Sequence, residues 1–251
     1  MYAVLLECDP GTTLGGSCYR DVKNMASNLI NRCNFPPENV YVLTTQQISP
    51  GNRVIGTNYD SSKNIFFVCD SVINKTDLKC LLVLISGHGF SMGDSNNDEL
   101  DGRDEAINIG SKYTIDDEIY SNIVVKFDNK KSDTILILLS DTCHSGTLFD
   151  LPYIIDENGF SQLSTKRTDI FKQNNDIVSL SACADSQLSM CDVGDVTGFG
   201  GSLTTAVLNI DGVLEDLIAN KNVIDVSKKI KNRLKLLNQS VVLSSSKTVI
   251  F

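Results

Sequence analysis

The sequence predicts a three-layer α/β sandwich in which helices flank a mostly parallel central sheet. Short runs rich in Val, Ile and Leu recur along the chain, and the runs at residues 80–86 and 134–140 show no alternation of apolar and polar positions. Unbroken apolar runs of this length are typical of parallel strands covered on both faces. The segments between them carry apolar residues at helical spacing, so strands and helices alternate along the chain.

Five strands and three main helices are predicted in chain order. The strands are expected at residues 2–7, 39–44, 80–86, 134–140 and 176–182. A helix over residues 21–33 would place Val22, Met25, Leu29 and Ile30 on one face, and amphipathic helices follow at residues 202–210 and 223–237. Two polar segments, at residues 89–106 and 152–175, do not fit the alternation. Both follow strand carboxyl ends, where open α/β sheets place their ligand sites.

Size and charge limit the domain organisation and the partners. The 251 residues suit one α/β domain or two small ones; a single domain over residues 1–251 is predicted, with the polar segment 152–175 as a linker between its two parts. The formal net charge of −9 argues against nucleic acid and anionic membranes as partners. No apolar stretch approaches the roughly 18 residues that span a bilayer. We expect a monomer that acts on proteins or peptides.

The eight cysteines are expected to be reduced thiols in the cytoplasm. None is part of a CxxC pair, and the N-terminus lacks the basic start and the apolar core of a secretory signal. Disulfides are rare in the cytosol, so most of these side chains are expected to be small buried hydrophobic groups. Because the first predicted strand begins at residue 2, no prodomain is expected before it.

Two short motifs carry the chemistry of a thiol nucleophile and its base. The sequence has two histidines, one at the end of a predicted strand in SGHG and the other beside a cysteine in DTCHSG. A nucleophilic thiol needs a base close by. Side chains two apart on a strand share a face, so His88 should lie beside Cys143 and His144 should point away. The backbone N–H groups of Gly89 and Cys143 are expected to hold the developing oxyanion.

With these motifs the sequence resembles the metacaspases. The matching pieces, in the order of the family, are SGHG, DELDGRDEAI, TIDDEI, SDTCHSGTLFDLPY, SLSACADSQ and VVLSSS. The resemblance covers nearly the whole chain and implies a caspase-like α/β fold with His88 and Cys143 as the catalytic dyad. It also implies cleavage of proteins after Arg or Lys, which in many members needs calcium. The chain departs from the family pattern at Ser17, where a glycine usually precedes the cysteine, and at Phe90 and Ser91 after SGHG.

A pocket for a basic side chain is expected next to the dyad. Ser86 and Asp141 lie one period-two step before the dyad residues, and Asp21 lies near the start of the first helix at the same end of the sheet. By resemblance, the pocket is lined by Cys18, Asp21, Ser86 and Asp141. Two carboxylates in a concave site favour Arg or Lys through charge-assisted hydrogen bonds. Alternatively, Asp21 is a charge near a helix N-terminus and Asp141 orients His88. Asp185 is a weaker pocket candidate.

Acidic residues after the third predicted strand raise the question of a calcium site. Asp94, Asn96, Asp98 and Glu105 have the spacing of EF-hand ligands, but Glu99 stands where that loop requires glycine and a strand precedes it, so an EF-hand is rejected. Hard cations nevertheless prefer clustered oxygen ligands. By resemblance, the calcium ligands are Asp104, Asp116, Asp117 and Asp150. The alternatives are a solvated acidic loop and, for Asp116 and Asp117, charges at the start of a helix.

We therefore expect a cysteine endopeptidase that cleaves proteins after Arg or Lys, is stimulated by calcium and cleaves itself in the linker. Lys166, Arg167 and Lys172 fit this specificity. One alternative is a catalytically idle scaffold or proteostasis factor on the same fold. Another is a legumain-like or separase-like peptidase of different specificity, which the acidic pocket disfavours. Activity on an Arg-containing reporter peptide separates the peptidase from the idle scaffold.

Overall fold

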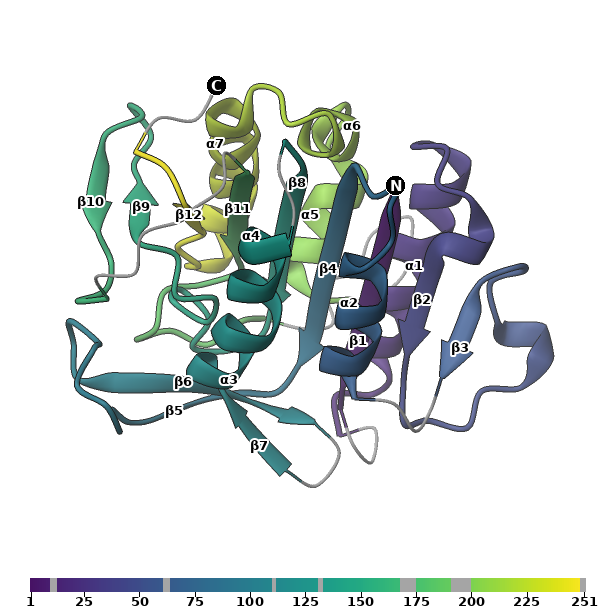
Figure 1. The fold of residues 1–251 in the computed structure, drawn as a ribbon, viewed down its shortest axis with the longest axis horizontal. Helices are drawn as coiled ribbons and strands as arrows, with labels where there is room; N and C mark the ends of the chain where they lie inside the picture. Colours follow the sequence, from purple (N-terminus) through teal and green to yellow (C-terminus); the bar gives the residue numbers. More distant parts are fainter. Residues whose placement is uncertain are drawn as a thin grey trace.

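A nine-stranded sheet forms the centre of the molecule (Figure 1). Its strand order is β10-β9-β12-β11-β8-β4-β1-β2-β3. The computed structural model describes residues 1–9, 13–60, 64–109, 112–130, 133–167, 175–190 and 200–248.

Most neighbouring strands of this sheet are parallel, as predicted. The parallel strands are β1 (Tyr2–Cys8), β2 (Val40–Leu43), β3 (Asn58–Asp60), β4 (Cys80–Gly87), β8 (Ile135–Asp141) and β11 (Asp176–Ser181). An antiparallel extension at one edge contains β9 (Tyr153–Ile155), β10 (Ser161–Leu163) and β12 (Val242–Ser245). The five long apolar runs of the sequence all form strands of the parallel part. The short polar strand β3 carries no such signal.

Helices cover both faces of the sheet and complete the three layers (Figure 1). One face packs against α1 (Ser17–Asn31), α5 (Ser202–Asn209), α6 (Val213–Ile218) and α7 (Val223–Leu234). The other packs against α2 (Ile65–Ile73), α3 (Asp116–Ile119) and α4 (Val125–Lys130), with a π-helical turn (Tyr120–Val124) between the last two. Successive side chains of a central strand enter opposite cores: Leu84 lies in the first and Ile85 in the second. Burial on both faces explains the unbroken apolar runs.

The predicted helices are present, with shifted ends. Helix α1 begins at Ser17, earlier than predicted, after Gly16, which has a left-handed backbone with φ of 74°. Its face of Val22, Met25 and Leu29 is buried, whereas Ile30 is only partly buried. Helix α7 ends at Leu234 and continues as a 3-10 turn (Lys235–Leu237). Further 3-10 turns lie at Pro37–Asn39 and Pro50–Asn52.

The polar segment after β4 is not only a loop. It contains β5 (Gly89–Gly93) and the start of β6 (Arg103–Ile109), which form a separate antiparallel sheet with β7 (Lys112–Ile115). These strands escaped prediction because polar and apolar residues are mixed along them, with no unbroken apolar run. Only a few apolar side chains, such as the fully buried Ile107, anchor this sheet to the core. Likewise, the linker segment 152–175 contains the short strands β9 and β10.

Cys143 differs from the other described cysteines. Cys8, Cys18, Cys33, Cys69, Cys80 and Cys183 are free and buried, whereas Cys143 is free and partly exposed. Cys191 lies outside the described residues. Within the described ranges, no helix has the length and apolar character needed to cross a membrane.

Candidate active site

The carboxyl ends of β4 and β8 bring the two sequence motifs together. The strands are parallel neighbours in a register that pairs Ser86 with Asp141. His88 and Cys143 follow two residues later, and both line one pocket of about 340 Å³, counted with its part open to solvent. Gly89 lies directly against the backbone of Cys143, since a Cβ there would be 1.9 Å from the Cys143 carbonyl oxygen. This close approach requires glycine.

The imidazole of His88 is held from the loop after β1. Thr13 Oγ1 lies 2.6 Å from His88 Nε2, and Asp9 Oδ1 lies 3.4 Å from the same nitrogen. Asp9 is fully buried; its Oδ1 accepts from Thr13 Oγ1 at 2.7 Å and its Oδ2 accepts from the Leu14 N–H at 2.9 Å. With Nε2 engaged, Nδ1 is the ring nitrogen left for the thiol. Sequence reasoning missed Asp9 and Thr13, whose only signal is their position just after a strand end.

His144 points away from the pocket. Its backbone is left-handed, with φ of 48°, and its Nδ1 contacts the carbonyl oxygen of Asp185. Asp185 Oδ1 accepts from the Thr147 N–H at 3.0 Å. Asp185, the weaker pocket candidate, therefore braces the turn that follows Cys143 and is not part of the pocket lining.

The Cys143 thiol is in a setting that favours its neutral form. Its Sγ lies 3.8 Å from the Ser189 carbonyl oxygen. Burial raises the pKa of the Cys143 thiol, and the nearby Asp141 charge raises it further. The thiolate is the nucleophilic species. Attack therefore needs a base that removes the proton, and the His88 imidazole lines the same pocket.

The four residues predicted to bind the substrate side chain all line the same pocket. They are Cys18, Asp21, Ser86 and Asp141. Asp21 accepts from Ser86 Oγ at 2.7 Å and from the Gly201 N–H at 2.9 Å. Asp141 accepts from the Thr204 N–H at 2.7 Å and from Ser189 Oγ at 3.0 Å. These bonds orient both carboxylates within the pocket and give Asp141 hydrogen-bond partners other than His88.

Burial disfavours the charged form of the two pocket carboxylates. Burial raises the pKa of Asp21, and the charge of Asp141 raises it further; burial likewise raises the pKa of Asp141. A cationic side chain placed between them would relieve this cost. Gly201 lies between the two, since a Cβ there would be 2.3 Å from Asp141 Oδ2. Sequence reasoning missed Gly201, although the glycine pair before α5 was a visible signal.

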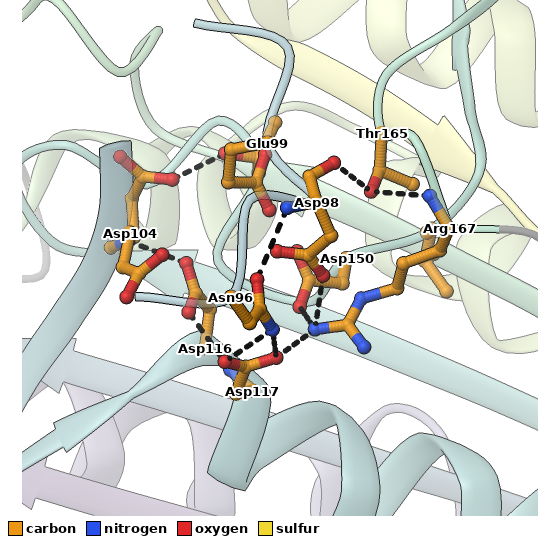
Figure 2. A network of polar contacts seen from close by, with 12 residues as sticks. Asn96, Asp98, Glu99, Asp104, Asp116, Asp117, Asp150, Thr165 and Arg167 are labelled. Carbon is orange, nitrogen blue, oxygen red and sulfur yellow. Dashed lines mark hydrogen bonds and ion pairs between the residues drawn. The ribbon is translucent and has the colours of Figure 1, made fainter. Parts of the chain in front are cut away.

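Three of the four predicted calcium ligands lie together. Asp104 of β6 and Asp116 and Asp117 of α3 offer oxygens that all lie within 4.8 Å of one another (Figure 2). The fourth, Asp150, groups with Asp98 and Glu99 instead, again within 4.8 Å. Strands β5 and β6 flank the loop that carries Asp98 and Glu99, so its surroundings are not those of an EF-hand, as predicted.

The chemistry of this acidic cluster suits a hard cation. Burial and then neighbouring carboxylates raise the pKa of Asp116 to about 8, of Asp150 to about 6 and of Glu99 to about 10. Within the described part of the chain, no donor reaches the buried atoms Asp150 Oδ1 and Glu105 Oε1. Crowded carboxylate oxygens are ligands that calcium prefers, and these two atoms have no competing donor among the described residues. Asp116 also begins α3 and accepts from the Asp117 N–H at 2.8 Å, so its alternative role at a helix start holds as well.

The chain has a caspase-like sandwich fold in which a thiol and an imidazole line one pocket at the edge of the central sheet. The structure matches Caspase-1 from Spodoptera frugiperda with a TM-score of 0.58 and 12% identity, over 100% of this chain and 89% of that chain, which shows the fold. The family model described as "Metacaspase, peptidase C14 domain" matches residues 3–152. The chain belongs to this metacaspase family of cysteine-type endopeptidases.

Two relatives show how far the similarity extends. Metacaspase-1 of Arabidopsis thaliana is 30% identical over 182 residues, which are 68% of this chain and 47% of that relative. Metacaspase-1 of Yarrowia lipolytica is 33% identical over 146 residues, which are 57% of this chain and 30% of that relative. The chain thus spans about half of the first relative and less of the second.

Proposed function

We propose that this chain is a cysteine endopeptidase that cleaves proteins after Arg or Lys. The observation that carries the proposal is a single pocket lined by Cys143, His88, Asp21 and Asp141. A thiol and an imidazole supply a nucleophile and a base. Two buried carboxylates beside them offer charge-assisted hydrogen bonds to a basic side chain and repel an acidic one.

In the proposed reaction, the Cys143 proton passes to His88 as Sγ attacks the carbonyl carbon of the residue before the cut. The N–H groups of Gly89 and Cys143 stabilise the oxyanion. The C–N bond then breaks, His88 gives its proton to the leaving amine, and a thioester remains on Cys143. Water attacks the thioester while His88 takes its proton. Breaking the C–S bond releases the new carboxyl terminus, and the proton returns to the thiol.

The proposal includes stimulation by calcium. Asp104, Asp116, Asp117 and Asp150 would hold the ion, which supplies positive charge that allows loops from separate elements to lie together. A contact joins this region to the active site: Thr147, in the turn after Cys143, donates to Glu105 Oε2. Order in the acidic cluster is therefore linked to order of the catalytic turn.

Self-cleavage in the linker is part of the same proposal. Lys166 and Arg167 fit the proposed specificity, and so does Lys172, which lies outside the described residues. We also propose that the chain acts as a monomer in the cytoplasm, where free thiols stay reduced.

Digestion of a peptide library tests the proposal. The purified chain is compared with Cys143→Ala, each in about 5 mM calcium and in excess chelator, a concentration near the weak end of known calcium sites. Cleavage after Arg and Lys, lost in the variant and in chelator, is the expected result. Faster cleavage after Asp would contradict the specificity, and full activity in chelator would contradict the calcium requirement. A folded chain that cuts nothing would favour the idle scaffold.

A further inference from the structure

The acidic cluster contains a cation from the chain itself. Arg167 Nη2 lies 2.7 Å from Asp98 Oδ2 and 2.9 Å from Asp150 Oδ2, and it also contacts Asp117 Oδ1 (Figure 2). The Arg167 side chain is only 15% exposed, and that of Asp150 is fully buried. The guanidinium carbon also lies 4.5 Å from the centre of the Tyr120 ring. Arg167 is thus seated on the acidic cluster and is not a solvated linker residue.

Two of the carboxylates that hold Arg167 are proposed calcium ligands, Asp117 and Asp150. An oxygen that accepts from a guanidinium at hydrogen-bond distance cannot at the same time coordinate a metal along the same direction, and the two cations would repel each other. We infer that Arg167 is an internal counter-ion that calcium must displace from Asp117 and Asp150, so that calcium binding releases the Arg167 segment. This inference rests on the proposed calcium site.

The contacts of the neighbouring residues show which two segments Arg167 helps to hold together. Thr165 Oγ1 donates to the Asp98 carbonyl oxygen at 3.1 Å, and the Lys166 N–H donates to the same oxygen at 2.7 Å. Thr165 also forms an isolated β-bridge with Glu99. The segment 165–167 is therefore attached to the loop between β5 and β6 through its backbone and through the Arg167 guanidinium. Loss of the three ion pairs removes the charged part of this attachment.

Release of this segment has a consequence for cleavage. A peptidase that cuts after Arg must take the whole side chain into its own acidic pocket. Arg167 cannot enter such a pocket while Asp98, Asp117 and Asp150 hold it. Calcium would thereby control whether the cleavage site in the linker is accessible, as well as whether the active site is ordered.

Calcium titration calorimetry on catalytically inactive chains tests the inference. Cys143→Ala is compared with Cys143→Ala/Arg167→Gln and with Cys143→Ala/Lys166→Gln. Lys166 is exposed and one residue away. Its substitution also removes one positive charge but leaves the Arg167 guanidinium in the acidic cluster. If Arg167 competes with calcium, Arg167→Gln should lower the dissociation constant about tenfold or more, whereas Lys166→Gln should change it by about twofold or less. Equal effects of the two substitutions would overturn the inference. Absence of binding in all three chains would overturn the calcium site itself, and with it the inference.

A second readout uses Cys143→Ala without further substitution, so it does not depend on folding of the Arg167 variant. Limited digestion with trypsin, followed by mass spectrometry, measures cleavage after Arg167. Rates are normalised to a free Arg peptide in the same buffers, since calcium also affects trypsin. Cleavage after Arg167 should be slow in chelator and at least about tenfold faster in calcium if release is needed for cleavage. An unchanged normalised rate would contradict release of Arg167.

Discussion

At the residue scale, the direction of the side chain distinguishes His88 from His144, the histidine that stands beside Cys143 in the second motif. His88 and Cys143 leave parallel strands two residues beyond a paired position and enter one pocket. His144 has a left-handed backbone and is bonded to the next turn. Because burial raises the pKa of the Cys143 thiol, the proposed reaction should depend strongly on a base.

The first prediction follows from this assignment. On an Arg reporter peptide, Cys143→Ala should abolish turnover, and His88→Ala should lower it by about 100-fold or more, the usual contribution of a general base. His144→Ala should retain much of the activity because its ring is outside the pocket. A loss from His144→Ala as large as that from His88→Ala would show that the side-chain directions have been misassigned.

Thr13 gives a second prediction at this scale. Its hydroxyl links the buried Asp9 carboxylate to His88 Nε2, so it should position the imidazole without contacting substrate. Thr13→Val should lower kcat about tenfold with little change in KM, since misplacing a catalytic group weakens the chemical step more than binding. Thr13→Ser, which retains the hydroxyl, should recover most of kcat. Equal losses in both variants would indicate a packing role only.

At the element scale, the two carboxylates of the proposed specificity pocket are supplied and held by separate segments. Helix α1 supplies Asp21, strand β8 supplies Asp141, and the segment before α5 supplies the Gly201 N–H that binds Asp21. The backbone of Gly201 fits only because it has no Cβ. Burial raises the pKa of both carboxylates, and the charge of Asp141 raises that of Asp21 further. The charge of the pocket therefore depends on pH above the usual range of aspartates.

This charge predicts a pH-dependent preference. Raised pKa values mean that the carboxylates gain their charge only as the pH rises above the ordinary value, and a guanidinium binds the charged form. The ratio of kcat/KM for an Arg substrate to that for its neutral citrulline analogue should therefore grow as the pH rises above the ordinary aspartate pKa of about 4. The ratio cancels effects on the dyad that both substrates share. A ratio that is flat or falls with pH would rule out these carboxylates as the pocket charge.

The parallel strands and the motifs at their ends could be predicted from the sequence. The residues from distant segments that contact those motifs could not. Doubly buried strands such as β4 and β8 have apolar runs that identify them, and period two then places His88 and Cys143 on facing sides. The sheet of β5, β6 and β7 mixes polar and apolar residues and has no such run. The contacts of Asp9 with His88, of Gly201 with Asp21 and of Arg167 with Asp150 depend on tertiary packing that local patterns do not encode.

At the scale of the whole molecule, the acidic cluster brings together residues of the outer sheet, a helix and a loop that follows a strand of the central sheet. Asp104 belongs to β6, Asp116 to α3 and Asp150 to the loop after β8. Their mutual repulsion opposes folding wherever they are ionised, and a bound cation removes it. Binding to the folded state alone raises stability by mass action.

Calcium should therefore stabilise the chain measurably. In thermal unfolding of Cys143→Ala, calcium at about 100 times its dissociation constant should raise Tm by roughly 5 to 10 °C, from about 2.7 kcal/mol of binding and the usual entropy of unfolding for a chain of this size. Asp116→Ala/Asp117→Ala should lose this shift. The same shift in the variant would mean that calcium binds elsewhere.

The most direct test of the central claim is the site of covalent capture by an Arg chloromethyl ketone, which alkylates a nucleophilic thiol in an Arg-binding pocket. In calcium, intact mass and peptide mapping should find one adduct, on Cys143, although the chain has eight cysteines. The other described thiols are buried, whereas Cys143 is partly exposed. An adduct on any other cysteine, or no adduct on a folded, calcium-loaded chain, would contradict Cys143 as the nucleophile of a peptidase for basic residues.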